Sequence, residues 1–187
     1  MLSSVTWLSQ IQALDEGLLR SAHGTPAALV PLFLVATVVG GGWGLLAVVP
    51  FALARATRTV TLWLLAAIVT QSAVVALIKV IVGRVRPCDA LAWCAPVAVG
   101  SPGGHSFPSG HAAGAFAFGV FMALRAPRFA ALSLGFAVTV AWSRCVLGVH
   151  YPSDVLAGAL LGGLIGAAFA RASLRPRAAA RPPGVVG

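Results

Sequence analysis

SRCVLGVHYPSD, residues 143–154, is the stretch that decides the fold, because it joins two long apolar runs. The runs on either side, residues 129–142 and 155–170, contain no charged side chain. Apolar runs of this length predict membrane-spanning helices. We therefore expect spans over about 129–149 and 155–170, with the polar residues of the quoted stretch gathered where the two spans meet at one membrane surface.

The composition of the whole chain is that of a membrane protein. Of its 187 residues, 59% are hydrophobic and only 9% are charged, whereas a soluble domain carries about 25% charged residues. The length suffices for one bundle of about five spans at roughly 20 residues each. We therefore predict an all-α fold, a polytopic transmembrane helical bundle of about five spans with an N-terminal interfacial helix.

The net charge of +9 does not indicate nucleic-acid binding. Basic residues stand singly or in pairs between apolar runs, whereas a nucleic-acid interface gathers them on one polar face. The expected partner is the lipid bilayer with its anionic headgroups. The sequence does not indicate an oligomeric state.

The remaining spans are expected at about 27–54, 60–82 and 109–124. The first of these is long for one crossing, and a bend at Gly40-Gly41-Gly42 would absorb the excess.

Three domains are predicted along the chain. Residues 1–24 have apolar side chains at helical spacing and predict an interfacial helix. Residues 25–171 form the membrane-embedded domain. The Arg- and Pro-rich residues 172–187 predict a disordered cytoplasmic tail.

Three clusters of polar residues, at 79–87, 108–111 and 143–154, all fall on one side of the predicted bundle. Lys79 ends the second span, Ser109 begins the third and Arg144 ends the fourth, so these residues meet at one membrane face. The opposite face carries eight basic residues: Arg55, Arg58, Arg125, Arg128, Arg171, Arg175, Arg177 and Arg181. Because cytoplasmic loops are enriched in Lys and Arg, we predict a multi-pass protein of the plasma or inner membrane with an extracytoplasmic active site.

Three cations in these clusters predict a site for a phosphate ester. Lys79 and Arg86 belong to a K-x6-R-P pattern, and Arg144 follows Ser143. An ionised Lys or Arg costs about 2.5–3.5 kcal/mol at the bilayer centre, and mutual repulsion adds to this cost. A dianionic phosphate relieves both, and Arg offers a planar fork to its oxygens. Taken singly, each cation is also explained by snorkelling to lipid headgroups.

The P-S-G-H stretch at residues 108–111 predicts a helix start that binds an anion. Ser109 and Gly110 would present free backbone N–H groups and the positive helix end to the phosphate. Gly110 allows a close approach to the backbone. Ser109 is equally expected as the N-cap, and both roles are compatible.

Two histidines and one carboxylate are the candidates for catalysis. Asp154 follows His150 by four residues across a turn with Pro152, so its carboxylate is expected to bind one ring nitrogen and leave the other free to attack. His150 is then the nucleophile and would form a phosphohistidine. His111 lies at a helix start without an acid nearby in sequence, and we assign it as the general acid.

Together these clusters resemble the signature of the type 2 phosphatidic acid phosphatase superfamily, which also includes the vanadium haloperoxidases. The resemblance covers residues 79–154 and rests on Lys79 with Arg86-Pro87, Pro108-Ser109-Gly110-His111, and Ser143-Arg144 with His150 and Asp154. It implies a helical bundle and metal-independent phosphate hydrolysis, with no cofactor and with the residue roles given above.

By the same resemblance, the substrate is a membrane lipid phosphate or diphosphate, such as polyprenyl diphosphate, phosphatidic acid or phosphatidylglycerol phosphate. The sequence does not choose among these lipids. The alternative is a non-catalytic lipid-binding or transporter component that retains an anion site. The presence of both histidines and of Asp154 favours the enzyme.

Two further features leave alternatives open. Cys88 and Cys94 fall in one expected outer loop, where an oxidising exterior permits a disulfide, although short loops often fail its geometry. Gly158, Gly162 and Gly166 recur every fourth residue and would allow close helix contact, either inside the bundle or between two copies. No spacing typical of metal ligands is present, so no metal site is expected.

Overall fold

The computed structural model describes residues 2–41, 49–95, 97 and 103–174, and all regular structure in them is helical. The helices are α1 (Leu2–His23), η1 (Ala27–Leu29), α2 (Val30–Val39), α3 (Val49–Leu53), α4 (Arg58–Val82), α5 (Pro87–Ala90), α6 (Gly110–Arg125), η3 (Pro127–Phe129), α7 (Ala130–Val146) and α8 (Pro152–Ala172). The predicted all-α fold class is confirmed for this part of the chain.

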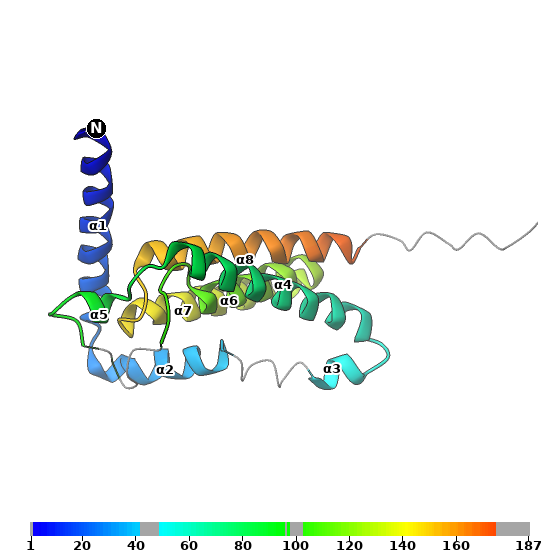
Figure 1. Cartoon of the computed structure of the whole chain (residues 1–187). Coiled ribbons are helices and arrows are strands. Elements are labelled where there is room, and N and C mark those ends of the chain that lie inside the picture. The colour runs from blue at the N-terminus through cyan, green and yellow to red at the C-terminus, as the bar shows by residue number, and fades with distance from the viewer. Residues whose placement is uncertain (1, 42–48, 96, 98–102, 175–187) are drawn as a thin grey trace, which may run out of the picture.

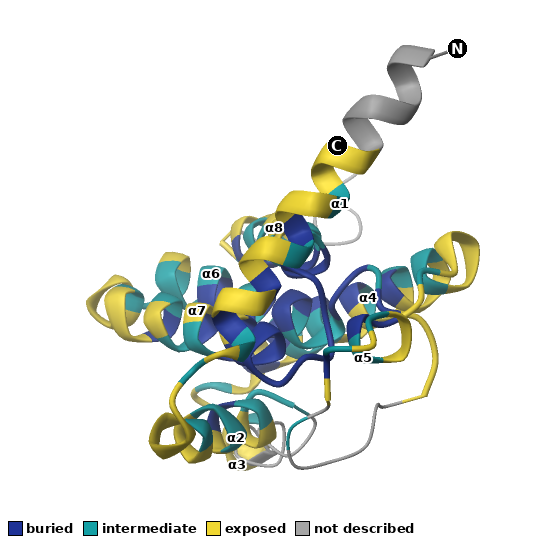
Figure 2. Cartoon of the chain, turned by 90° about the vertical axis from the view of Figure 1, so that its left-hand side faces the viewer, coloured by how far each residue is buried: buried dark blue, intermediate teal, exposed yellow. Residues whose placement is uncertain are grey.

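Helices α4, α6, α7 and α8 run alongside one another and form the bundle, with α2 along one side (Figure 1). α6 lies at its centre, because α4, α7 and α8 all pack against it. Figure 2 shows the buried residues gathered in the middle of the bundle and the exposed ones around its rim. Small side chains on α6 permit this packing, and Ala112, Ala113, Ala115 and Ala117 are all buried.

Glycines on α8 bring that helix against the backbone of α6. A Cβ atom on any of three of them would overlap a carbonyl oxygen of α6. The pairs are Gly158 with Ser109, Gly162 with Ala113, and Gly166 with Ala117. The glycine pattern therefore serves contact within the bundle. It also fixes how the first turn of α8 sits against the first turn of α6.

Among the residues that the structure describes, three stretches are long and apolar enough to cross a membrane, namely Arg58–Ala90, Pro127–Val146 and Pro152–Ala172. A fourth is added if the pair Ser9–His23 and Ala27–Val39, bent by 82°, counts as one span. α6 has 16 residues, so it is about 24 Å long and shorter than a hydrocarbon core of about 30 Å. The helices thus support membrane embedding, while the count of five spans stays a prediction.

Two expected spans have different ends in the structure. α7 ends at Val146, three residues before the expected end, because Gly148 adopts a left-handed conformation with φ 71° that is typical of helix ends. α8 begins at Pro152, since proline fits the first turn of a helix. It runs for 21 residues, so the expected span of about 16 residues was too short.

The first expected span is interrupted. α2 ends at Val39 with Gly40 as its C-cap, which is where a bend was expected. Gly42 lies outside the described residues, as do Arg175, Arg177 and Arg181 in the predicted tail.

α1 stands across one end of the bundle, roughly perpendicular to α8 (Figure 1). Leu19 and Ala22 of α1 pack into a buried cluster that includes Cys145 and Tyr151. Leu14, by contrast, is 66% exposed. α1 therefore presents one apolar face outward while its other side covers the region where α7 ends and α8 begins.

Candidate active site

The predicted site residues gather at the end of the bundle that α1 covers. Because bundle helices that follow one another in the chain run in opposite directions, the ends of α4 and α7 lie beside the starts of α6 and α8 (Figure 1). The site takes Lys79 from α4, Arg86 from the start of α5, Ser109, Gly110 and His111 from the start of α6, Arg144 from α7, and His150 and Asp154 from the turn into α8.

His150 and Asp154 form a buried pair and are 3% and 0% exposed. Nδ1 of His150 lies 3.7 Å from Oδ2 of Asp154, and the backbone N–H of Tyr151 donates to the same oxygen at 2.9 Å. Nδ1 has no hydrogen-bond partner among the described residues. Since Asp154 is the acceptor that it faces, we assign the ring proton to Nδ1. Nε2 then carries the lone pair, which accepts a long hydrogen bond of 3.4 Å from Nη1 of Arg86.

The surroundings of His150 keep its ring neutral. Burial, followed by the charges of Arg144 and Arg86, lowers the pKa of His150 from 6.5 to about 4, and Asp154 opposes the shift. A neutral imidazole at physiological pH has a lone pair available for attack on an electrophile.

Two buried guanidinium groups flank this ring. Arg86 donates to the carbonyl oxygen of Val149 at 2.9 Å. Arg144 donates to the hydroxyl of Thr37 on α2, while its Nε is a buried donor without a partner among the described residues. Arg86 and Arg144 are both about 5% exposed. A buried N–H group without an acceptor costs free energy. An anion placed here would supply the acceptors.

Lys79 adds a third positive charge. Its Nζ donates to the carbonyl oxygen of His105, and its charge acts on Arg86 and Arg144. Like charges this close repel one another, so the cluster favours a ligand with more than one negative charge.

Ser109 fastens the start of α6 to the start of α8. Its Oγ accepts from the N–H of Ala112 at 3.4 Å, as expected of an N-cap, and its own N–H donates to the carbonyl oxygen of Asp154 at 2.9 Å. The first N–H groups of α6, beginning with Gly110, have no acceptor within the helix. They therefore add donors at the edge of the cationic cluster.

His111 reaches toward α2 and remains close to the cluster. A Cβ atom on Gly41 would lie 3.1 Å from Nε2 of His111, so glycine there leaves room for the ring. The His111 ring is within electrostatic range of Arg144 and His150. The two histidines therefore lie at one site, as the sequence predicts.

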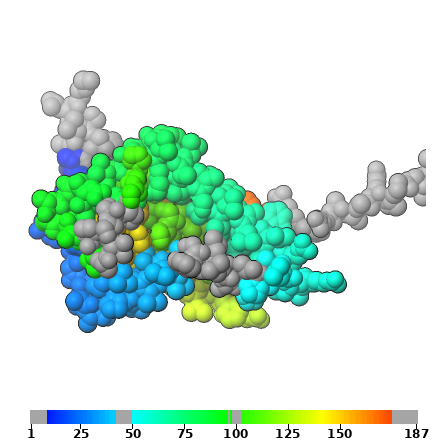
Figure 3. All heavy atoms as spheres, turned by 60° about the horizontal axis from the view of Figure 1, so that its bottom comes forward, coloured from blue at the N-terminus to red at the C-terminus, as the bar shows by residue number. Residues whose placement is uncertain are grey.

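A cavity of about 1030 Å³ leads away from this site along the bundle. Lys79 and His111 line it at one end and Phe129 at the other, with mainly apolar residues of α2, α4 and α6 between them. Figure 3 shows this face hollowed between α2 and α4, with α6 at the bottom of the hollow. Residues along almost the whole length of α6 line the cavity. The cavity is therefore long enough for an apolar chain of about 20 Å.

Two residues at the site, Arg84 and Asp15, have no role in the sequence-based prediction. Arg84 stands at an unassigned position of the K-x6-R-P stretch, and its Nη1 donates to Oδ1 of Asp154 at 2.6 Å. Asp15 belongs to the expected interfacial helix, yet it is 4% exposed and pairs with Arg84 at 2.8 Å. The sequence offered one signal for this pair: a chain with only four acidic residues has few carboxylates that could pair with a partly buried Arg.

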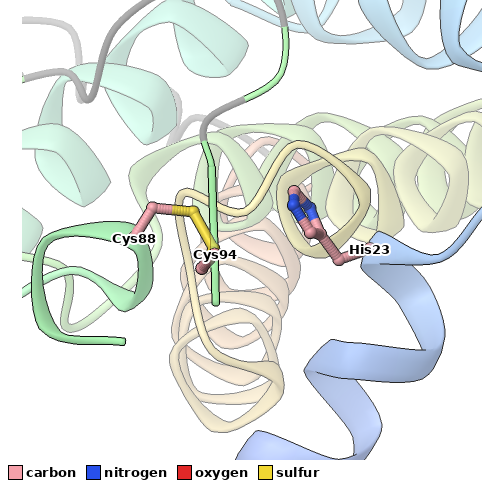
Figure 4. A group of neighbouring side chains, drawn as sticks. All are labelled: His23, Cys88 and Cys94. Atoms are coloured by element: carbon pink, nitrogen blue, oxygen red, sulfur yellow. A yellow bond between two sulfur atoms is a disulfide. The ribbon is translucent and has the colours of Figure 1, made fainter. Parts of the chain in front are cut away.

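Cys88 and Cys94 are joined by a disulfide beside α5, and Figure 4 shows His23 of α1 next to it. Ligand atoms of these three residues lie within 4.8 Å of one another, as in a metal site. The two sulfurs are bonded to each other, however, and Nδ1 of His23 lies 3.0 Å from the carbonyl oxygen of Val146. The group packs around Gly148, where a Cβ would be 2.5 Å from Sγ of Cys88.

Known proteins are similar to this chain in sequence and in the arrangement of helices. Residues 60–177 match the PAP2 superfamily. The decaprenylphosphoryl-5-phosphoribose phosphatase of Mycobacterium tuberculosis is 39% identical over 132 residues, which are 67% of this chain and 68% of that protein. The lipid A 4'-phosphatase of Bacteroides thetaiotaomicron is 36% identical over 98 residues, 49% of this chain and 44% of that protein. Matches to the lipid A phosphatases thus span less than half of their length.

A solved structure extends the likeness to almost the whole fold. The transmembrane PAP2 type phosphatidylglycerolphosphate phosphatase from Bacillus subtilis superposes with a TM-score of 0.72 at 26% identity, covering 87% of this chain and 85% of that one. Because the family match takes in well over half of the sequence and the signature residues converge in the structure, this chain belongs to the PAP2 superfamily.

Proposed function

We propose that the chain is an integral membrane phosphatase that hydrolyses a lipid phosphate or diphosphate without a metal ion. The observation that carries the proposal is the buried pair of His150 and Asp154, which faces three cations at the head of a long apolar cavity. The neighbouring proteins named above are phosphatases, which supports the same reaction class.

The reaction proceeds through a covalent intermediate on His150. Nε2 attacks phosphorus, and the N–P bond forms as the P–O bond to the lipid breaks. Nδ1 keeps its proton, which Asp154 binds, and the carboxylate stabilises the positive ring. His111 gives its proton to the leaving oxygen and later takes one from the water that attacks the phosphohistidine. Inorganic phosphate then leaves, and both histidines return to their starting state.

The remaining site residues hold the phosphate. Lys79, Arg86 and Arg144 supply positive charge, and the N–H groups at the start of α6, beginning with Gly110, supply backbone donors. The Ser109 N–H, which the sequence predicted to be free, already donates to the carbonyl oxygen of Asp154. Charge that builds on the phosphoryl oxygens during attack is stabilised by donors already in place, which is commonly the largest contribution to such catalysis.

The cavity accounts for a lipid substrate. An apolar chain lying between α2 and α4 remains in contact with the bilayer while its phosphate reaches Lys79 and His111. The substrate class is therefore a phosphorylated lipid such as polyprenyl diphosphate, phosphatidic acid or phosphatidylglycerol phosphate. A cavity of about 1030 Å³ lies at the upper end of the usual range of about 300–1000 Å³, as a long chain requires.

The proposed topology has five spans with α1 in the membrane interface and the site on the extracytoplasmic side. The perpendicular setting of α1, with apolar residues on its outer face, fits a helix that lies along the surface. Five basic residues that the structure describes lie at the opposite end of the bundle: Arg55, Arg58, Arg125, Arg128 and Arg171. Since cytoplasmic loops are enriched in Lys and Arg, they favour a cytoplasmic location for that end.

Phosphate release from each of these three lipids, by purified protein in detergent with EDTA present, tests the proposal. Wild-type protein is expected to release phosphate from at least one lipid and to form an acid-labile phosphoenzyme, and His150→Ala is expected to do neither. Binding of the lipids without phosphate release by wild type would instead support the non-catalytic alternative. Undiminished release by His150→Ala would remove His150 from the reaction.

A further inference from the structure

Arg84 bridges two carboxylates that come from opposite ends of the sequence. Its Nη1 donates to Oδ1 of Asp154 at 2.6 Å and to the hydroxyl of Ser153 at 2.7 Å. Its Nη2 donates to Oδ2 of Asp15 on α1 at 2.8 Å. The guanidinium also lies over the ring of Tyr151, with Cζ 4.0 Å from the ring centre. These contacts fix the plane of the guanidinium in a single orientation.

Asp15 holds the first turn of α8 as well as Arg84. Its Oδ1 accepts from the backbone N–H of Ser153 at 2.9 Å, and its Oδ2 accepts from the Ser153 hydroxyl at 2.5 Å. Ser153 immediately precedes Asp154. α1 is thereby joined to the helix start that carries the carboxylate of the catalytic pair.

The two oxygens of Asp154 have separate partners as a result. Oδ1 is held by Arg84, and Oδ2 accepts from Tyr151 N–H and faces Nδ1 of His150. If Oδ1 were released, the carboxylate could rotate about its Cβ–Cγ bond and present either oxygen to the ring at a changed angle. The orientation of the imidazole depends on this carboxylate, because Oδ2 is the acceptor that Nδ1 faces, at 3.7 Å, and Nδ1 has no hydrogen-bond partner among the described residues.

We propose that Asp15 and Arg84 are positioning residues, which hold the Asp154 carboxylate so that Nε2 of His150 points at the phosphorus. The inference rests on the proposed function, since it assumes that His150 attacks. α1 thereby takes part in catalysis through the contacts of Asp15 with Arg84 and Ser153. None of these three residues belongs to the family signature.

The burial of this network distinguishes it from an ordinary surface ion pair. Asp15 and Asp154 are 4% and 0% exposed, and the Arg84 side chain is 22% exposed. Surface ion pairs are screened by water and often contribute nothing measurable. A carboxylate that is removed from water depends on its partners for its position, so loss of one partner changes the geometry of the others.

The test compares kcat and KM of purified variants in detergent, with whichever of polyprenyl diphosphate, phosphatidic acid and phosphatidylglycerol phosphate the wild type hydrolyses fastest. Asp15→Asn and Arg84→Lys are each expected to lower kcat about 10-fold, the scale of outer-shell effects on an oriented imidazole. KM should change less than about 3-fold, because neither residue contacts the phosphate groups directly. Lysine keeps the charge of Arg84 but lacks the planar fork, in which Nη1 holds Asp154 and Nη2 holds Asp15.

Two matched controls accompany these variants. Glu16→Gln makes the same chemical change on the next residue of α1, whose carboxylate accepts from Gln12 at 2.8 Å and, among the described residues, is linked to Arg84 only through that amide, which accepts from Nη2 at 3.3 Å. Arg55→Met removes an exposed arginine at the far end of the bundle. Both should keep wild-type kcat, and thermal unfolding in the same detergent shows whether each variant is folded at the assay temperature.

The double variant Asp15→Asn/Arg84→Lys separates positioning from a general loss of structure. If both residues act through the same carboxylate, the double variant loses no more kcat than the worse single variant. Multiplication of the two losses, or unchanged kcat in folded Asp15→Asn and Arg84→Lys, would overturn the inference. If Asp15→Asn does not fold, the Arg84→Lys result alone decides. Absence of phosphate release by wild type would instead overturn the proposed function, and the inference with it.

Discussion

Alanine at Gly162 is expected to destabilise the protein, whereas alanine at the next residue, Gly163, is expected to stabilise it. Both changes add the same methyl group and gain about 1 kcal/mol of helix propensity. At Gly163 the new Cβ would meet only Cγ2 of Val120, at 3.6 Å, which is ordinary contact. At Gly162 it would overlap the carbonyl oxygen of Ala113 and lie 2.6 Å from the carbonyl carbon, and a backbone cannot move aside as a side chain can.

The propensity gain is shared, so the difference between the two variants measures the overlap itself. Overpacking costs typically about 1–3 kcal/mol, and one kcal/mol shifts Tm by about 2–4 °C in a chain of this size. Thermal unfolding of both variants in one detergent therefore should give Gly163→Ala the higher Tm by several degrees. Equal Tm values would refute the close contact of α6 and α8 on which the site geometry depends.

Three further predictions concern the site and its surroundings. Lys79→Met should lower kcat/KM by about 10²–10³, as loss of one electrostatic donor does, in a phosphate-release assay. The pKa of His150 is about 4 in the folded protein, against an ordinary value of 6.5, so between these pH values the unfolded chain binds a proton that the folded chain does not. The free energy of unfolding, measured by denaturant titration, should therefore fall as the pH drops from about 6.5 to 4. The same measurement on His150→Asn should give a smaller slope. Replacing Cys88 and Cys94 by serine should cost about 2 kcal/mol, from the entropy of the short loop that the disulfide closes, measured as a lower Tm than that of wild type under non-reducing conditions.

The gathering of the candidate site residues at one end of the bundle could be predicted from sequence because each part of the site is local. His150 and Asp154 are one helical turn apart, and Ser109 with its neighbours marks a helix start that spacing alone reveals. The alternating direction of successive spans then predicted that the clusters meet at one end of the bundle. Each of these signals needs only a few neighbouring residues and the direction of a span.

The contacts of Arg84 could not be predicted in this way, because they join residues that are 69 and 70 positions apart. Periodicity assigns Asp15 to the polar side of a surface helix, and only the folded chain shows that this side meets α8. The helix boundaries at Val146 and Pro152 were misplaced for a related reason. The turn between them depends on the left-handed backbone of Gly148, whereas a hydropathy pattern continues through a glycine.

The charges around the site explain why a partly buried Arg84 is compatible with phosphate binding. The negative charge of Asp15 neutralises the positive charge of Arg84, so this pair does not change the net charge of the pocket. The three cations Lys79, Arg86 and Arg144 and the single carboxylate of Asp154 then leave a net charge of two positive units. This charge is equal in size and opposite in sign to that of a phosphate monoester above its second pKa of about 6. Asp89 on α5 also acts on Arg86, but it is exposed and screened by solvent. A bound dianion would therefore neutralise the pocket as a whole, whereas an Arg84 without Asp15 would leave an excess positive charge beside the carboxylate that must remain directed at His150.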